Sequence, residues 1–382
     1  MKRVILIPDS FKGTMSSAEV CSVMESSIRR FYPRAEVRSV PVADGGEGSV
    51  DAFLGALGGK KIALPVRGPF SEDVPSFYGI LADGKTVVIE MAACSGLPLA
   101  EGRLNPLLTT TYGAGQLIKA AVQAGCSKII MGLGGSATND GGCGAAAALG
   151  VRFLDGAGNP FVPTGGTLAE IRHIDREGLD PALAKVEIVT MCDIDNPLYG
   201  KTGAAHVFGP QKGATPPIVE ALDAGLRHLA DVAASSLGID AAMMPGAGAA
   251  GGMGYGMRVF LGSQLRMGIE TVLDTVDFDA LLRGTDAVFS GEGKIDSQSL
   301  RGKVISGIAR RTKKAGVPLI AVVGDIGDGI DAAYDRGLTA VFSINRVAVP
   351  FSEAKKRAKN DLRLTMDEIM RLSQAAGKWG EG

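Results

Sequence analysis

The chain has 382 residues, a formal net charge of −1 and a composition that is 46% hydrophobic and 21% charged. This length predicts about two domains with a buried core, and the composition excludes an intrinsically disordered chain. The near-neutral charge argues against a protein that binds nucleic acid or anionic lipid.

The first part of the chain predicts an α/β fold. The apolar run 4–7 is too short for a signal peptide and indicates a buried strand, so we expect a cytoplasmic protein. Ser16 and Glu19 then form the pattern of a capping box that opens a helix. A strand is expected at 37–42 and a helix at 50–57. This alternation is typical of a parallel sheet.

The rest of the chain extends the pattern. Residues 62–92 predict strands with turns, and helices are expected at 109–124 and 217–236. Further strands are expected at 128–131, 186–191, 287–289, 319–323 and 338–344. A long helix is expected to end the chain. We therefore predict a Rossmann-like or flavodoxin-like parallel-sheet domain formed by residues 1–62 and 284–382. Residues 63–283 are expected to form an inserted mixed α/β domain, although the strand–helix unit 127–150 is compatible with either domain.

Glycine is over-represented, with 54 residues, about twice the usual share, and it gathers in loops. Gly79–Thr86 matches the phosphate-loop pattern, but strand patterns on both sides and the Asp83-Gly84 pair favour a hairpin. Gly132-x-Gly134-x-x-Ala137 follows a strand, with Asp155 near the spacing of a ribose-binding acid. A nicotinamide-dependent hydroxy-acid oxidoreductase is therefore one alternative.

The segment 132–150, GLGGSATNDGGCGAAAALG, carries the most information. Small residues let backbone N–H groups converge on an anion, and a following helix adds partial positive charge. Ser136, Thr138 and Asn139 would add side-chain hydrogen bonds, while Asp140 would hold a metal ion or cap the helix. We interpret this segment as an anion-binding loop; the alternative is a tight strand–helix turn.

Acidic side chains follow most of the predicted strands: Asp9, Asp44, Glu47, Glu90, Asp193, Asp195, Glu292, Asp296 and Asp325. Ligands of open α/β sheets bind beyond the carboxyl ends of the strands. These acids, together with Lys12 and Lys294 in glycine-containing loops, suit Mg²⁺–phosphate chemistry. Each acid taken alone is equally well explained as a helix cap. The common serine-hydrolase and zinc-enzyme motifs do not occur in the sequence.

Six segments together resemble the class I glycerate kinases, the glycerate 2-kinase family: IPDSFKG (7–13), PVADGGEG (41–48), GLGGSATNDGGCGAAAALG (132–150), CDIDNPLYG (192–200), GAAGGMGYG (248–256) and SGEGKIDSQSLRGK (290–303). The resemblance implies two α/β domains with the active site in a cleft. It implies transfer of phosphate from ATP, with Mg²⁺, to D-glycerate, giving 2-phospho-D-glycerate and ADP in glyoxylate or aldarate catabolism. Small molecules would be the only partners, and a homodimer is left open.

On this reading, we expect Asp193 first and Asp44 second to accept the proton of the attacking hydroxyl, with Lys12 and Lys294 stabilising the phosphoryl group or the substrate carboxylate. The expected phosphate- or substrate-binding residues are Ser10, Lys12, Gly134, Gly135, Ser136, Thr138, Asn139 and Asp140, and the expected Mg²⁺ ligands are Glu292 and Asp296. The alternatives are a glycerate 3-kinase, the oxidoreductase, a non-catalytic sensor of a small acid, and a homoserine- or mevalonate-type kinase. The last is considered because the segment GLGGSA is similar to a loop of those kinases.

Overall fold

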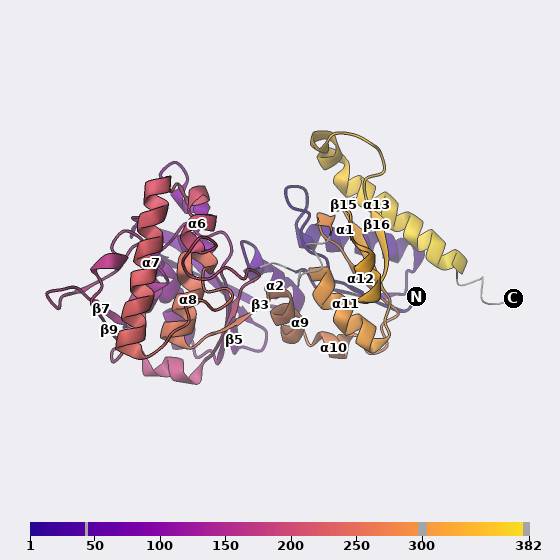
Figure 1. Cartoon of the computed structure of the whole chain (residues 1–382). Coiled ribbons are helices and arrows are strands. Elements are labelled where there is room, and N and C mark those ends of the chain that lie inside the picture. Colours follow the sequence, from indigo (N-terminus) through magenta and orange to yellow (C-terminus); the bar gives the residue numbers. More distant parts are fainter. Residues whose placement is uncertain (43–44, 297–303, 377–382) are drawn as a thin grey trace. The chain divides into compact units, whose positions relative to one another are not determined.

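The computed structural model describes residues 1–42, 45–296 and 304–376 (Figure 1). The chain divides into two compact units, each of which has its own central sheet. Unit 1 comprises residues 1–43, 55–57 and 269–382, and unit 2 comprises residues 44–54 and 58–268. The α/β class is as predicted, and the domain boundaries after residues 62 and 283 stay a prediction.

Unit 1 is built on a five-stranded parallel sheet with the order β16-β14-β12-β1-β2. The strands are β1 (Arg3–Leu6), β2 (Glu36–Ser39), β12 (Ala287–Ser290), β14 (Leu319–Val323) and β16 (Leu338–Ser343). Counted in chain order, this is the flavodoxin-like order 2-1-3-4-5, in which the chain reverses its winding direction between β1 and β12.

Both faces of this sheet are covered by helices. Val4 and Leu6 pack into a core shared with α1 (Ser17–Phe31) and α13 (Phe351–Ala376), which lie side by side (Figure 1). Ile5 is equally buried and points to the opposite face, because successive strand residues alternate. The helix α11 (Val304–Ala315) packs against β14 and β16. The remaining helices are α9 (Gly268–Thr275), whose first residue belongs to unit 2, and α10 (Phe278–Leu281) and α12 (Asp331–Asp335) of unit 1.

The start of α1 confirms the capping box. The Ser16 hydroxyl accepts the Glu19 backbone N–H, and the Glu19 carboxylate accepts the Ser16 N–H at 2.9 Å. Two backbone donors that a helix start leaves unpaired are thereby satisfied. This local signal fixed the beginning of the helix correctly.

Unit 2 has a six-stranded mixed sheet with the order β11-β10-β6-β5-β4-β3. Its strands are β3 (Gly59–Arg67), β4 (Asp73–Leu81), β5 (Thr86–Glu90), β6 (Lys128–Gly132), β10 (Glu187–Met191) and β11 (Gln264–Arg266). The four strands from β11 to β5 are parallel, and β4 and β3 add antiparallel strands. The Asp83-Gly84 turn joins β4 to β5, which confirms the hairpin and leaves no phosphate loop at Gly79–Thr86.

Helices complete unit 2 and form a second core beside the sheet. They are α4 (Tyr112–Gln123), α5 (Cys143–Ala148), α6 (Ala204–Phe208), α7 (Pro216–Leu237) and α8 (Ala249–Leu261), with a small sheet of β8 (Pro160–Phe161), β7 (Arg152–Leu154) and β9 (His173–Asp175). The short helix α2 (Ser49–Leu57) has residues in both units. Within the described ranges, no helix has the length and apolar character needed to cross a membrane.

Candidate active site

The carboxyl edge of the unit 2 sheet gathers three of the segments singled out in the sequence. Glu90, Gly132 and Met191 are the last residues of β5, β6 and β10, and the strand register places them side by side. The loops that follow therefore leave from one edge. They contain Asp193 after β10 and the glycine-rich loop 133–142 after β6. Ligands of parallel sheets bind at this kind of edge.

The segment Gly45–Gly48 lies against the same edge. The Gly134 N–H donates to the Gly45 carbonyl at 2.9 Å, and a Cβ atom at Gly132 would lie 2.3 Å from that oxygen. The buried Glu90 carboxylate accepts the backbone N–H groups of Gly48 and Val50 at 3.1 and 2.5 Å. Burial raises the pKa of Glu90, and these two hydrogen bonds oppose the rise. Asp44, the second candidate for the base, lies outside the described residues.

A buried lysine supports the glycine-rich loop from behind. Lys212, at the end of a 3₁₀ turn (Pro210–Lys212), is 1% exposed. Its ammonium group donates to the Ser136 hydroxyl at 2.9 Å and to the Thr138 carbonyl at 2.6 Å. Burial lowers the pKa of Lys212 to about 7, and the nearby negative charge of Asp140 limits the fall. A lysine whose side chain is charged below about pH 7 thus lies directly under the loop.

Lys212 is not among the lysines predicted from the sequence. The predicted lysines stand beside both acids and glycines, whereas Lys212 has glycine neighbours, Gly209 and Gly213, but no acid nearby in sequence. Its partner Thr138 lies 74 residues earlier. The only local signal was a lysine within a glycine- and proline-rich turn, which is also typical of the surface.

Asp140 organises the loop. Its buried carboxylate accepts hydrogen bonds from the Thr111 N–H and hydroxyl at 2.7 and 2.9 Å, and from the Gly142 and Gly144 N–H groups at 3.1 Å each. Burial raises the pKa of Asp140, and these hydrogen bonds oppose the rise. The same contacts hold Thr111 just outside α4, so that the helix begins at Tyr112 and not at 109 as predicted.

Two side chains of the loop offer hydrogen-bonding groups that protein atoms do not use. Asn139 and Thr138 have no solvent exposure, and across the described residues neither the Asn139 amide nor the Thr138 hydroxyl has a hydrogen-bond partner. Buried polar groups are seldom left unsatisfied in folded proteins, and such groups gather at functional sites. Next to the Lys212 ammonium, they suit the oxygens of a carboxylate or phosphate.

The glycine-rich segment of α8 packs directly on this loop. Ala250, Gly251 and Gly252 all have left-handed backbone angles, and the Gly251 carbonyl accepts the Gly141 N–H at 3.0 Å. A Cβ atom at Gly251 would lie 2.0 Å from the Thr138 carbonyl oxygen, the same oxygen that Lys212 binds. Only glycine combines this backbone angle with so close an approach.

Gly251→Ala is therefore expected to destabilise the protein and disturb the loop. The left-handed angle alone costs about 1–2 kcal/mol, and the clash with a backbone oxygen adds to it. Gly238→Ala is the control, because Gly238 has φ +68°, close to the +67° of Gly251, but open space around its Cβ position. We expect urea denaturation to show at least about 2 kcal/mol more loss for Gly251→Ala. Equal losses would refute the packing argument.

Asp193 is exposed, and its position is fixed. One carboxylate oxygen accepts the Gly268 N–H at 2.7 Å, at the start of α9. The next acid of the same loop, Asp195, is also exposed. Asp193 thus combines an oriented carboxylate with access from solution, as a general base requires.

Unit 1 brings together the loops after β1 and β12, at the point where the winding direction reverses. The Asp9 N–H donates to the Gly291 carbonyl and the Ser290 hydroxyl to the Ile7 carbonyl, at 2.8 and 2.9 Å. These loops carry the remaining predicted residues: Ser10, Lys12, Glu292, Lys294 and Asp296. Lys12 and Lys294 are exposed, Glu292 is buried, and the Lys294 ammonium lies 3.7 Å from the Asp296 carboxylate.

Comparison with known proteins shows the family of this chain. The family described as the glycerate kinase family matches residues 4–374. The chain belongs to the glycerate kinase family.

Individual relatives cover nearly the whole chain. A glycerate kinase of Bacillus subtilis (strain 168) is 45% identical over 96% of both chains. A glycerate 2-kinase of Escherichia coli (strain K12) is 43% identical over 94% of this chain and 95% of its own. A crystal structure under the name glycerate kinase 2 from Salmonella typhimurium LT2 has a TM-score of 0.88 and 41% identity, and covers 99% of each chain.

The nicotinamide alternative does not fit the geometry of this glycerate kinase family member. A dinucleotide fingerprint opens a helix directly after its strand, so that the pyrophosphate meets the helix N-terminus. Here β6 ends at Gly132 and α5 begins only at Cys143. Asp155 accepts the N–H groups of Ala157 and Asn159 in a local turn. The close approach of Gly45 and Gly46 explains Gly132 and Gly134 without a dinucleotide, because a Cβ atom at either position would lie within 2.5 Å of that segment.

Proposed function

We propose that this protein transfers the terminal phosphoryl group of ATP to the C2 hydroxyl of D-glycerate, giving 2-phospho-D-glycerate and ADP. Membership of the glycerate kinase family along residues 4–374 carries this proposal. The name of the Escherichia coli relative, glycerate 2-kinase, favours the C2 hydroxyl over the C3 hydroxyl. Such a reaction serves organic acid breakdown in the cytoplasm, and it requires no nucleic acid or membrane.

In the proposed reaction, Asp193 accepts the proton of the glycerate hydroxyl as its oxygen attacks the terminal phosphorus, and ADP leaves with the bridging oxygen. Lys12 and Lys294 stabilise negative charge on the phosphoryl group. The loop of Gly134, Gly135, Ser136, Thr138 and Asn139 binds the substrate carboxylate or a phosphate, and Asp140 and Lys212 hold that loop in shape.

Glu292 and Asp296 are the proposed residues for Mg²⁺. Mg²⁺ is often held by one or two carboxylates together with substrate phosphates, so two acids near Lys294 fit this requirement. In the ranges that the structure covers, no cluster of three or more metal-binding side chains occurs. Mg²⁺ bound to ATP would neutralise phosphate charge as the phosphoryl group moves.

Phosphorus NMR of the purified protein with D-glycerate, ATP and Mg²⁺ tests this function. A new phosphate-ester signal split into a doublet by the single C2 proton is the expected result. A triplet from the C3 methylene would instead identify a glycerate 3-kinase. Unchanged ATP with no new ester signal would contradict kinase activity, and a reaction without D-glycerate controls for ATP hydrolysis.

A further inference from the structure

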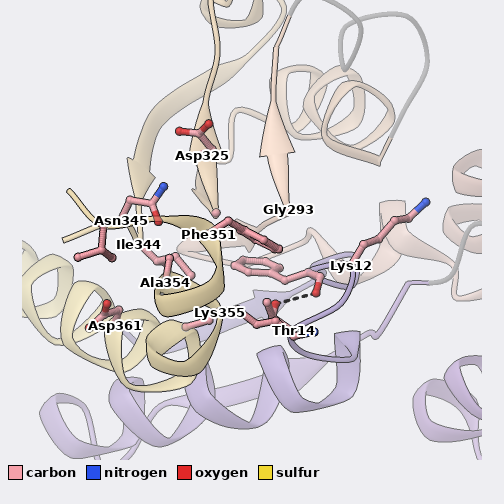
Figure 2. A pocket seen from close by; sticks show the side chains of 14 residues that line it. Lys12, Thr14, Gly293, Asp325, Ile344, Asn345, Phe351, Ala354, Lys355 and Asp361 are labelled. Atoms are coloured by element: carbon pink, nitrogen blue, oxygen red, sulfur yellow. Dashed lines mark hydrogen bonds between the residues drawn. The ribbon is translucent and has the colours of Figure 1, made fainter. Parts of the chain in front are cut away.

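Unit 1 contains a pocket of about 240 Å³ (Figure 2). Of the residues that line it, the proposed mechanism uses only Lys12. It opens at the carboxyl edge of the parallel sheet. Its lining comes from the loop after β1, from Gly293 after β12, from the residues that follow β14 and β16, and from the first turns of α13. The residues are Phe11, Lys12, Thr14, Gly293, Gly324, Asp325, Ile344, Asn345, Val349, Phe351, Ala354, Lys355, Ala358 and Asp361.

One wall of the pocket is apolar and aromatic. Phe351, the first residue of α13, is 70% exposed, the highest exposure among the large hydrophobic residues of the described chain. It lines the pocket together with Phe11 and Ile344, which are both buried. A flat ring that stays exposed beside a buried apolar wall leaves room for a second flat group to stack against it.

A polar side chain lies next to this apolar wall. Asn345 directly follows Ile344, shortly after the end of β16, and within the described part of the chain its side-chain amide makes no hydrogen bond (Figure 2). An asparagine amide presents one donor and one acceptor side by side. This pair matches the N6 and N7 atoms of adenine, with which asparagine forms two hydrogen bonds.

The charged residues that line the pocket are two lysines, Lys12 and Lys355, and two acids, the exposed Asp325 and the buried Asp361. The buried Asp361 carboxylate is neutralised by Arg357, with N···O distances of 3.1 and 3.3 Å. Lys355 is exposed at the rim, and Lys12 points away from Phe351 and Asn345 (Figure 2). Lys12 stands on the loop after β1, where the winding direction of the sheet reverses. Phosphates extending from a base in the pocket would therefore meet this lysine.

We propose that this pocket binds the adenosine part of ATP, with the adenine ring stacked on Phe351 and its N6–N7 edge on Asn345. The inference rests on the proposed use of ATP and assigns the nucleoside to unit 1. Nucleotides bind at the carboxyl edge of sheets with this strand order, near the strands where the winding reverses. The mixture of an aromatic wall, an unpaired amide and lysines suits a purine nucleotide better than a small acid such as glycerate.

Phe351→Ala and Asn345→Ala test the proposal. Both side chains are exposed, so neither change should unfold the protein. Loss of base stacking is expected to raise the KM for ATP and the Kd for ADP about tenfold in Phe351→Ala. The KM for D-glycerate and the affinity for tripolyphosphate, which has no base, should stay within about twofold. Asn345→Ala should reduce the preference for ATP over GTP.

Leu372→Ala is the matched control. Leu372 is an exposed apolar residue of the same helix, 49% exposed and about 30 Å from Phe351 along the helix axis. The pocket proposal would be overturned if both pocket variants bound ADP as tightly as the wild type, or if binding of ADP and of tripolyphosphate were weakened equally. In either case, formation of phosphoglycerate by the wild type would still support the proposed kinase reaction. ADP binding that depends on Phe351 in a protein that forms no phosphoglycerate would uphold the pocket and refute the proposed reaction.

Discussion

Asp193→Asn is expected to lower kcat by about 10²–10⁴-fold, the usual contribution of a positioned general base. Asparagine has the same shape, and its side-chain oxygen can still accept the Gly268 N–H that orients Asp193. The change therefore removes the ability to take a proton and keeps the anchoring hydrogen bond. Because Asp193 is exposed, no buried charge is lost and the stability of the fold should not change.

Asp195→Asn is the control for this experiment. Asp195 lies in the same loop and is also exposed, so its replacement changes the net charge of the loop equally. We expect its kcat to stay within about threefold of the wild type, since a change in surface charge alone contributes little. Near-normal kcat in Asp193→Asn would mean that Asp193 only holds the Gly268 N–H, and it would leave Asp44 as the candidate base.

Lys212→Met is expected to lower kcat/KM by about 10²–10³-fold, the typical result of removing one preorganised charged donor. Methionine fills a similar volume, and the energetic cost of burying an ammonium group disappears with the charge. The loop would keep most of its packing but lose the cation below Ser136 and Thr138. Lys201→Met, which removes an exposed lysine of unit 2, should have no comparable effect.

The pH dependence distinguishes an electrostatic role of Lys212 from a purely structural one. Its pKa of about 7 means that the ammonium loses its proton as the pH rises through neutrality. An anion bound at the loop favours the charged form and raises this pKa, so binding between about pH 7 and 9 should take up a proton. Calorimetry in buffers of different ionisation enthalpy measures that uptake, and it should vanish in Lys212→Met.

The lowered pKa of Lys212 makes the stability of the fold change with pH in the opposite direction to the anion affinity. An unfolded lysine titrates near its ordinary value of 10.5, so between about pH 7 and 10.5 the unfolded state binds more protons at this residue. The free energy of unfolding contributed by Lys212 therefore rises with pH over this window, while anion affinity falls. The prediction would be contradicted if anion affinity and the free energy of unfolding changed in the same direction with pH in the wild type. If Lys212→Met also showed the same pH dependence as the wild type, Lys212 would not be the titrating group.

Local patterns in the sequence predicted those features that neighbouring residues decide. The Ser16–Glu19 capping box set the start of α1, and the Asp83-Gly84 turn set the β4–β5 hairpin, because each depends on hydrogen bonds within four residues. The prediction for α4 was wrong at its start. Thr111 is held outside the helix by Asp140, and residues 29 positions apart leave no local signal.

The sequence by itself determined the α/β class, the strand ends where acids and glycines gather, and, through its combined motifs, the glycerate kinase family. The spacing of apolar residues and the residue types in turns depend only on near neighbours, and the order of the motifs can be read directly from the sequence. The tertiary structure alone decided that Lys212 lies under the Ser136–Thr138 turn and that Phe351 and Asn345 face one pocket. Burial and long-range packing place these side chains, and both depend on how strands and helices far apart in sequence come together.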